Sequence, residues 1–223
     1  MKAIDVRWIS FSGSNSFSEV LSLFCEAKKA DAGLYNDFFE CVQPFVAKLP
    51  KKNFEHQWAR GQQIFQYTHI VSDTAYIINF LPDQMFRAID NSQTIFQTTA
   101  LDRIADQLIY SYDGTVGRST DKRILLAPFP LASMPGNKGF VVIDGNHRVA
   151  EAVKTDSLSS LTGYTISPFY SEAAYFADCY SFFLYTFISG LFLLPTLDNQ
   201  QYASYCQRLH DLFSLYLQFV LRH

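Results

Sequence analysis

Residues 144–148, DGNHR, combine the side chains that a phosphate-binding turn needs. They follow an apolar stretch at 140–143 and precede a stretch with helical spacing of apolar residues, so they would join a strand to a helix. The first-turn amides of a helix lack partners within the helix, and the helix dipole adds partial positive charge there. Gly145 would let an anion approach the backbone, and Arg148 could bind a phosphate through two nitrogens. His147 could donate a hydrogen bond or carry a proton near neutral pH, so the run predicts an anion site.

The same run could be an ordinary turn between a strand and a helix. In that interpretation Asp144 and Asn146 are present for local hydrogen bonding. We favour the binding interpretation because adjacent His147 and Arg148 at a helix start have no evident packing role.

Residues 142–152, VIDGNHRVAEA, resemble the signature of the ParB/sulfiredoxin-like fold family. The resemblance covers residues 85–170, and in that family this turn binds the phosphates of a nucleotide. Members include chromosome-partitioning CTP switches, sulfiredoxin and free-serine kinases. The resemblance implies that Gly145, Asn146, His147 and Arg148 contact phosphate. It also implies that Asp144 serves magnesium through water, or proton transfer in a kinase-like member.

Two departures from the family's members narrow the function. Sulfiredoxin needs a cysteine where this chain has Asn146, which argues against reduction of sulfinic acids. The partitioning proteins carry a helix-turn-helix module, and no convincing one follows residue 170. The net charge of −3 and pI of about 5.9 provide no basic field to recruit nucleic acid.

We therefore expect a nucleotide-phosphate-binding protein, either a magnesium-dependent ATPase or a small-molecule kinase-like phosphotransferase. Asp144, His147 and Arg148 would be catalytic, and the cofactor would be ATP, ADP or CTP with Mg²⁺. One alternative is a nucleotide-dependent switch or interaction module without turnover. A weaker alternative is a ParB-like nuclease, against which the missing basic face counts.

Other charged residues could assist this turn. The loop at 113–123 is rich in glycine and basic residues but lacks the ending of a P-loop, so it is either a lid or a solvated loop. Asp90 and Asp102 could supply a base or hold magnesium, or they could be surface or capping residues. Glu151 could orient the imidazole of His147 from one helical turn away, or simply be solvated. The basic residues that such a lid could bring to the phosphates are Arg118, Lys122 and Arg123.

The elements that would position these residues alternate between helical and strand patterns. Together they predict an α+β protein, a small ParB/sulfiredoxin-like mixed-sheet core flanked by N- and C-terminal helices. We expect three segments, at 1–84 (a helical extension), 85–170 (the core) and 171–223 (helices packing on the core or on a partner). Helices are expected within 16–49 and at 54–67, 99–110, 147–154 and 200–223, with one more starting at Ser171 or Glu172. Strands are expected at 69–80, 85–89, 124–127 (stopped by Pro128 and Pro130), 140–143 and 164–166, with a turn at 133–139.

Cysteine usage and the N-terminus indicate a cytoplasmic protein. The chain has four cysteines among 223 residues, with no CxxC pair and no zinc spacing, so reduced thiols are expected. Residues 1–7 lack the apolar run of a signal peptide.

Residues 175–194 form the most apolar stretch of the chain and are just long enough to span a bilayer. They contain Asp178 and several tyrosines, and no lysine or arginine flanks them closely. A buried or partner-covered helix is therefore the better interpretation. Any part of this face left exposed in the monomer would predict a homodimer through the aromatic C-terminal helices.

Overall fold

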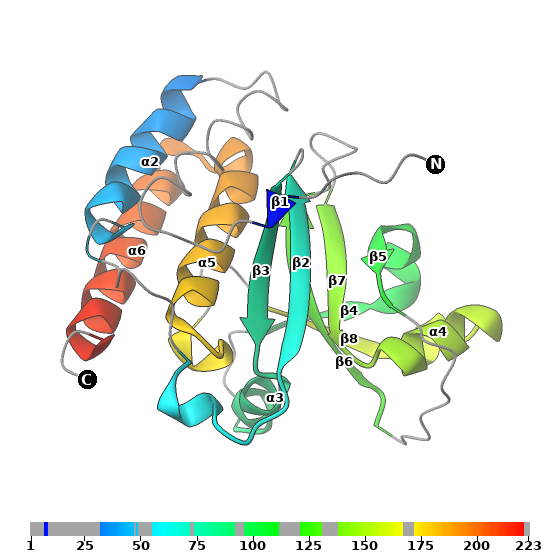
Figure 1. Ribbon diagram of the computed structural model, residues 1–223. Coiled ribbons are helices and arrows are strands. Elements are labelled where there is room, and N and C mark those ends of the chain that lie inside the picture. The colour runs from blue at the N-terminus through cyan, green and yellow to red at the C-terminus, as the bar shows by residue number, and fades with distance from the viewer. Residues whose placement is uncertain are drawn as a thin grey trace.

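The computed structural model describes residues 7–8, 32–46, 48, 55–71, 74–91, 96–111, 121–130, 138–166 and 172–220, and they form helices and two sheets packed in layers. The fold class is α+β, as the sequence predicts. Figure 1 shows two helices on one side of the molecule, a third between them and the strands, and a fourth beyond the strands. In that order these helices are α2 (Ala32–Val46), α6 (Asn199–Val220), α5 (Cys179–Leu193) and α4 (Asn146–Lys154).

The larger sheet has five strands, in the order β4 (Phe96–Ala100), β8 (Thr162–Ile166), β6 (Arg123–Pro130), β7 (Lys138–Asp144) and β5 (Leu108–Ile109). It is mixed, because β6 runs parallel to β8 and antiparallel to β7. The expected strands at 140–143 and 164–166 are confirmed within β7 and β8.

The central strand β6 is longer than predicted. The sequence predicts that Pro128 and Pro130 stop the strand, yet both lie within β6. They come after Leu126, the last residue of β6 that pairs with β8. A strand can carry proline where no neighbour needs its amide donor, so pairing with β7 continues through Pro128 to Pro130, the last residue of the strand.

Both faces of the five-stranded sheet are covered, and alternate residues of β6 face opposite sides. Leu125 and Ala127 belong to the larger core cluster, together with α5 residues. Ile124 and Leu126 belong to a smaller cluster with Val149 of α4. The sheet therefore separates α5 from α4, and α4 is positioned by its own patch of core.

The smaller sheet is a hairpin, β2 (Phe65–Val71) and β3 (Thr74–Phe80), with β1 (Arg7–Trp8) parallel to β3. The predicted helix at 54–67 is wrong, because this part contains only the short 3₁₀ helix η1 (Gln57–Ala59) before β2 begins. The predicted strand at 69–80 is in fact the end of one strand and the whole of the next. This part of the N-terminal segment is therefore not helical.

Two further predictions, the strand at 85–89 and the helix at 99–110, are also wrong. Residues 85–89 form part of helix α3 (Pro82–Asp90), not a strand, and Pro82 suits its first turn. The predicted helix at 99–110 is strand β4 followed by the 3₁₀ helix η2 (Leu101–Gln107), because Thr98 and Thr99 pair with β8. The spacing identified part of the buried side: Leu101 and Ile104 are buried, but Ala105, predicted on the same face, is exposed.

The helical structure expected within 16–49 is confirmed for its second half as α2, which includes Pro44 in its last turns. The helical pattern at 16–31 lies outside the described residues, as does most of the turn predicted at 133–139. The helix at 147–154 is confirmed as α4, and the C-terminal one as α6. The apolar stripe of α6, including Tyr205, Leu209 and Phe213, is buried against the core.

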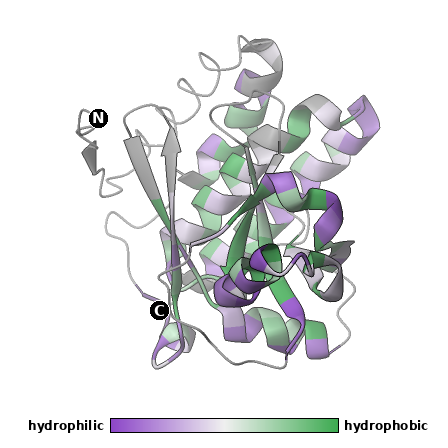
Figure 2. Ribbon diagram, turned by 90° about the vertical axis from the view of Figure 1, so that its right-hand side faces the viewer, coloured by the Kyte–Doolittle hydropathy of each residue, from purple (hydrophilic) through white to green (hydrophobic). Residues whose placement is uncertain are grey.

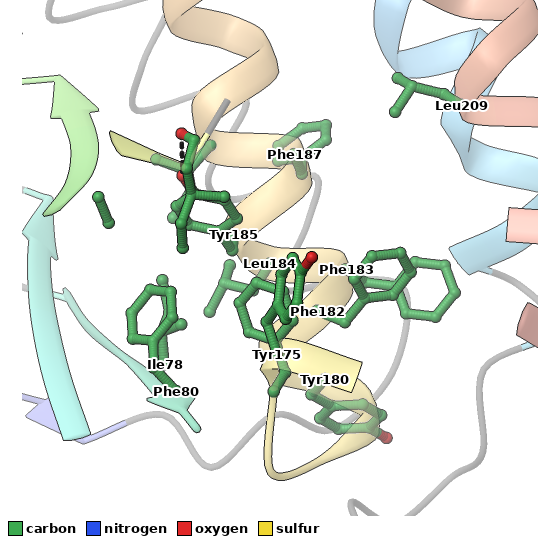
Figure 3. Packing of buried hydrophobic residues seen from close by; sticks show 14 of the residues in the cluster. Ile78, Phe80, Tyr175, Tyr180, Phe182, Phe183, Leu184, Tyr185, Phe187 and Leu209 are labelled. Atoms are coloured by element: carbon green, nitrogen blue, oxygen red, sulfur yellow. Dashed lines mark hydrogen bonds between the residues drawn. The ribbon is translucent and has the colours of Figure 1, made fainter. Parts of the chain in front are cut away.

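Helix α5 is surrounded by the rest of the chain. Every residue from 179 to 190 is buried, and the helix packs on β3 and β6. Figure 3 shows Ile78 and Phe80 on the strand side of α5, with Phe183 directed the other way and Leu209 beyond on α6. The chain therefore covers these residues itself, and the homodimer stays a prediction. No helix in the described ranges is long and apolar enough to cross a membrane.

A buried polar cluster fixes the start of α5. Asp178, 5% exposed, accepts hydrogen bonds at Oδ1 from the amides of Tyr180 and Ser181, at 3.1 and 2.9 Å. Its Oδ2 accepts from the Ser181 hydroxyl and from Asn79 Nδ2 of β3, both at 2.7 Å. The helix thus begins at Cys179, after this N-cap, rather than near Ser171 or Glu172. Short 3₁₀ turns occur at η3 (Leu158–Ser160), η5 (Ala173–Tyr175) and η6 (Leu194–Thr196).

Replacing Gly190 with alanine is expected to destabilise the fold by about 2 kcal/mol, because the core there has no room for a methyl group. An added Cβ would lie 2.6 Å from Cζ of Phe38 and 2.7 Å from the hydroxyl oxygen of Tyr205, both fully buried. Urea denaturation of Gly190→Ala would measure the change. The control is Phe38→Leu, in which the added methyl should be better tolerated. Equal losses in both backgrounds would contradict the close contact.

Candidate functional site

The predicted phosphate-binding turn lies where β7 ends and α4 begins. Gly145 has a φ of +95°, in the left-handed region that favours glycine. A Cβ at this position would collide with the side chain of Ile124 and lie 3.1 Å from Nη2 of Arg148. The guanidinium of Arg148 therefore lies over the glycine. Both the conformation and this close approach require glycine here.

The side chain of Asn146 ties the turn to the neighbouring strands. Its Nδ2 donates to the carbonyl of Val142 at 3.0 Å, and its Oδ1 accepts from the amide of Ser111 at 2.8 Å. Asn146 thus links the end of β7 to the residues that follow β5. Its side-chain amide is engaged in the scaffold, which matches the local hydrogen bonding considered as the alternative for this residue.

Arg148 joins three parts of the site. Its Nη2 donates to Oδ2 of Asp144 at 2.6 Å, one helical turn earlier. Its Nη1 donates to the backbone carbonyl of Asp121 at 2.8 Å, just before β6. The side chain is only 14% exposed. Arg148 therefore holds β7, α4 and the start of β6 together.

The contacts continue from Asp121 as an ion-pair chain, consisting of Asp144, Arg148, Asp121, Arg123 and Asp90. Arg123 donates through Nε and Nη2 to the carboxylate of Asp121, at 3.1 and 2.8 Å. Its Nη1 reaches Asp90 at the end of α3, at 2.5 Å, and its guanidinium lies 4.8 Å from the centre of the Phe86 ring. The hydrogen bond from Arg123 holds the pKa of Asp121 below its ordinary value, although burial opposes it.

The charges of the ion-pair chain nearly cancel. Three carboxylates face two guanidinium groups, so the chain carries a formal charge of −1. A phosphate approaching Arg148 would meet Asp144 and Asp121 beside it. An anion could bind strongly here only if Arg148 exchanged partners or if a cation accompanied the anion.

The structure brings some predicted accessory residues to the turn and leaves others apart. Arg123 and Asp90 belong to the ion-pair chain. His147 is half-buried beside Arg148, while Glu151 and Lys122 are exposed. In the described part of the chain, Asp102 is exposed on η2 and is not a member of the ion-pair chain. Arg118 lies outside the described residues.

Asp121 is the member of the site that sequence reasoning missed. A signal was available, because Asp121 and Arg123 are two residues apart at a strand start, and side chains at that spacing point to the same face. Its contact with Arg148 joins residues 27 positions apart in the sequence, so no local sequence pattern could predict it.

Seen from the α4 side, hydrophilic residues lie mainly on the outer elements and hydrophobic residues on the strands behind them (Figure 2). Within the described ranges, no group of three or more histidine, cysteine, aspartate or glutamate side chains could hold a metal ion. Asp144 and Asp121 instead offer a pair of carboxylates on either side of Arg148. Because each carboxylate is paired with Arg148, the two could hold a magnesium ion, together with phosphate oxygens and water, only if the guanidinium moved away from them.

His56 is a second titratable group in a special environment. It is 2% exposed, its Nε2 lies 2.6 Å from the hydroxyl of Tyr216, and its ring stacks on Trp58 at 4.0 Å. Burial lowers the pKa of His56 to about 4, although the charge of Asp178 opposes this. It is therefore a packed, neutral histidine, more buried than its isolated place in the sequence suggests.

Comparison with known proteins finds no match: no family model, no curated protein and no solved structure is similar to this chain. The description of the molecule therefore rests on its own structure. It is an α+β protein in which an ion-pair chain holds the glycine turn between a strand and a helix. The family resemblance rests on the motif at 142–152 and stays a prediction.

Proposed function

We propose that the chain binds the phosphates of a nucleotide at the N-terminus of α4, as a magnesium-dependent ATPase or a kinase-like phosphotransferase. One observation carries the proposal: left-handed Gly145 brings the start of α4, the Arg148 guanidinium and the Asp144 carboxylate together at the end of a buried strand. A helix N-terminus with an adjacent arginine favours phosphate. Since Gly145 has no side chain, it cannot cap the first-turn amides as serine or aspartate would.

The charge balance of the site supports a nucleotide that arrives with magnesium. A bare triphosphate would face Asp144 and Asp121, which already neutralise Arg148. A divalent cation between these carboxylates and the phosphates would remove that repulsion and free Arg148 for the phosphate oxygens. When bound, Mg²⁺ would supply neutralisation of the phosphate charge.

The residues of the turn would then have distinct roles. Arg148 would stabilise charge on the transferred phosphoryl group, and His147 would donate a hydrogen bond or hold a proton at its imidazole. Asp144 would orient the cation through water or accept a proton. Asn146 would act through the scaffold, because its side chain is used between β7 and the residues after β5.

A thermal-shift series would test the nucleotide site. With ATP, ADP, CTP or GTP and Mg²⁺ at about 100 times the dissociation constant, the wild type should gain about 2.7 kcal/mol. For a chain of this size that is a shift of roughly 5–10 °C. Without magnesium the shift should be smaller, because the carboxylates then repel the phosphates.

The variant that tests the site is Arg148→Gln, and its matched control is Lys154→Gln at the other end of the same helix. Each removes one positive charge from α4, but only the first removes the guanidinium beside Gly145. We expect at least tenfold weaker nucleotide binding by Arg148→Gln and wild-type binding by Lys154→Gln. Equal weakening in both variants, or no shift with any nucleotide in folded wild type, would reject the proposal.

A switch without turnover is the second candidate, and a specific contact favours it. Arg148 also holds the carbonyl of Asp121. A phosphate that recruited this guanidinium would release the start of β6, so binding could change the surface there. Release of inorganic phosphate from a bound nucleotide would identify an enzyme. Binding with no product over many hours would favour the switch.

A further inference from the structure

Helices α2 and α6 lie side by side on the opposite side of the molecule from α4 (Figure 1), and each contributes one cysteine to a contact between them. The two helices run in the same direction: Phe38 stacks on Tyr205, and Phe45 contacts Phe213 further along. Cys41 lies between the two phenylalanines on α2, and Cys206 directly follows Tyr205 on α6. The helix register thus places both cysteines at the same level of this interface.

The contact between the two cysteines is direct. Sγ of Cys41 lies 4.0 Å from the backbone carbonyl oxygen of Cys206, and each thiol shifts the pKa of the other. Both thiols are free and half-buried, whereas Cys179 is fully buried in α5. A small oxidant can therefore reach the pair but not Cys179. The two cysteines are therefore in contact across the interface between α2 and α6, which a disulfide between them requires.

The surroundings give the two thiols different reactivity. The hydrogen bond from Cys41 lowers the pKa of Cys206 to about 7, with help from the hydroxyl of Tyr202 and against the effect of burial. The same hydrogen bond, together with burial, raises the pKa of Cys41. The Cys41 thiol is engaged as a donor to the Cys206 carbonyl, and the thiolate is the nucleophile. Cys206 is therefore the thiol that reacts first, and Cys41 is the one that resolves the product.

We propose that Cys41 and Cys206 form a reversible disulfide that links α2 to α6 in response to a peroxide. The Cys206 thiolate attacks a peroxide oxygen, the O–O bond breaks, and a sulfenic acid forms while the leaving hydroxide takes a proton to become water. The Cys41 sulfur then attacks the Cys206 sulfur, the S–O bond breaks, and a second water leaves with the thiol proton. Two thiols thus give two electrons to one peroxide. A dithiol reductant reverses the reaction.

Hydrogen peroxide on the full chain tests this pair, read out by intact mass and non-reducing peptide mapping. We expect a monomer lighter by about 2 Da, with Cys41 and Cys206 in one crosslinked peptide, restored by dithiothreitol. Because Cys25 lies outside the described residues, a crosslink from Cys25 to either thiol would overturn the proposal. A crosslink between two copies of the chain would overturn it equally.

Single variants separate the two roles. Cys41→Ser should stop at a sulfenic acid on Cys206, which a 1,3-diketone probe would trap. Cys206→Ser should slow the first oxidation at least tenfold, and Cys179→Ser should oxidise like wild type. Alkylation of Cys206 by iodoacetamide should have its midpoint near pH 7. A midpoint near that of an ordinary thiol, with no disulfide in folded wild type, would overturn the assignment.

Discussion

Replacing Asp178 with alanine is expected to lower the free energy of unfolding by about 4 kcal/mol, the largest effect foreseen for a single polar residue here. The carboxylate caps α5 by accepting the amides of Tyr180 and Ser181. It also accepts from Asn79 of β3, so the same group joins the helix to the hairpin. Alanine would remove the cap and leave buried donors unpaired. Each such donor carries a penalty of about 1–3 kcal/mol.

Asp198 provides a matched control, since it caps α6 at an exposed position. Its Oδ1 accepts the amide of Gln201 at 2.8 Å, and the Gln201 side chain accepts the amide of Asp198 in return. Asp198→Ala should lose only about 1 kcal/mol. Asp178→Asn, which keeps one acceptor for the cap, should fall between the two alanine variants. Chemical denaturation would measure the free energy of unfolding of all three variants. Equal losses at positions 178 and 198 would refute a buried network around Asp178.

Lowering the pH from 7 to 5 is expected to remove about 2 kcal/mol of stability through His56. The ordinary pKa of this histidine is 6.5, and burial lowers it to about 4 in the folded protein. Between these values the unfolded chain takes up a proton that the folded protein excludes. Stability is therefore fully present above pH 6.5 and is lost as the pH falls toward 4, by about 3 kcal/mol in all.

His56→Gln isolates this effect, because glutamine can still hydrogen bond to Tyr216 but does not titrate. Asp121 does not interfere at pH 5: its ordinary pKa is 3.8 and its folded pKa is lower, so its contribution is lost only below about pH 4. Urea denaturation at pH 7 and pH 5 should show a smaller difference for the variant than for wild type. An identical pH dependence would mean that His56 is not the group responsible.

The sequence patterns that predicted structure correctly were those in which neighbouring residues all favour the same secondary structure. The apolar run at 140–143 followed by a glycine turn gave β7 and α4, since burial and the glycine conformation agree there. The apolar stretch at 175–194 was correctly favoured as a buried helix. Its missing polar face reflects two layers packed against it, which a single sequence shows only as uniform hydrophobicity.

The errors came where tertiary contacts decide between competing local preferences. Met85 and Ala88 lie on one face of α3, a spacing that is helical, but the segment is too short to be distinguished from a strand by pattern alone. Thr98 and Thr99 could cap a helix, yet they pair with β8, which is distant in sequence. In the same way, the turn with Arg148 was predictable from adjacent residues, while its partner Asp121 depends on how β6 and β7 pair.

The enclosed position of α5 also determines when the protein can fold. Helix α5 covers the apolar faces of β3 and β6. It begins at Cys179, about a hundred residues after β3 ends. During synthesis these strands therefore emerge without their cover, and long-range contacts of this kind form slowly. Folding of the whole chain must wait for the central helix, and a nascent chain paused before it exposes surfaces that chaperones recognise.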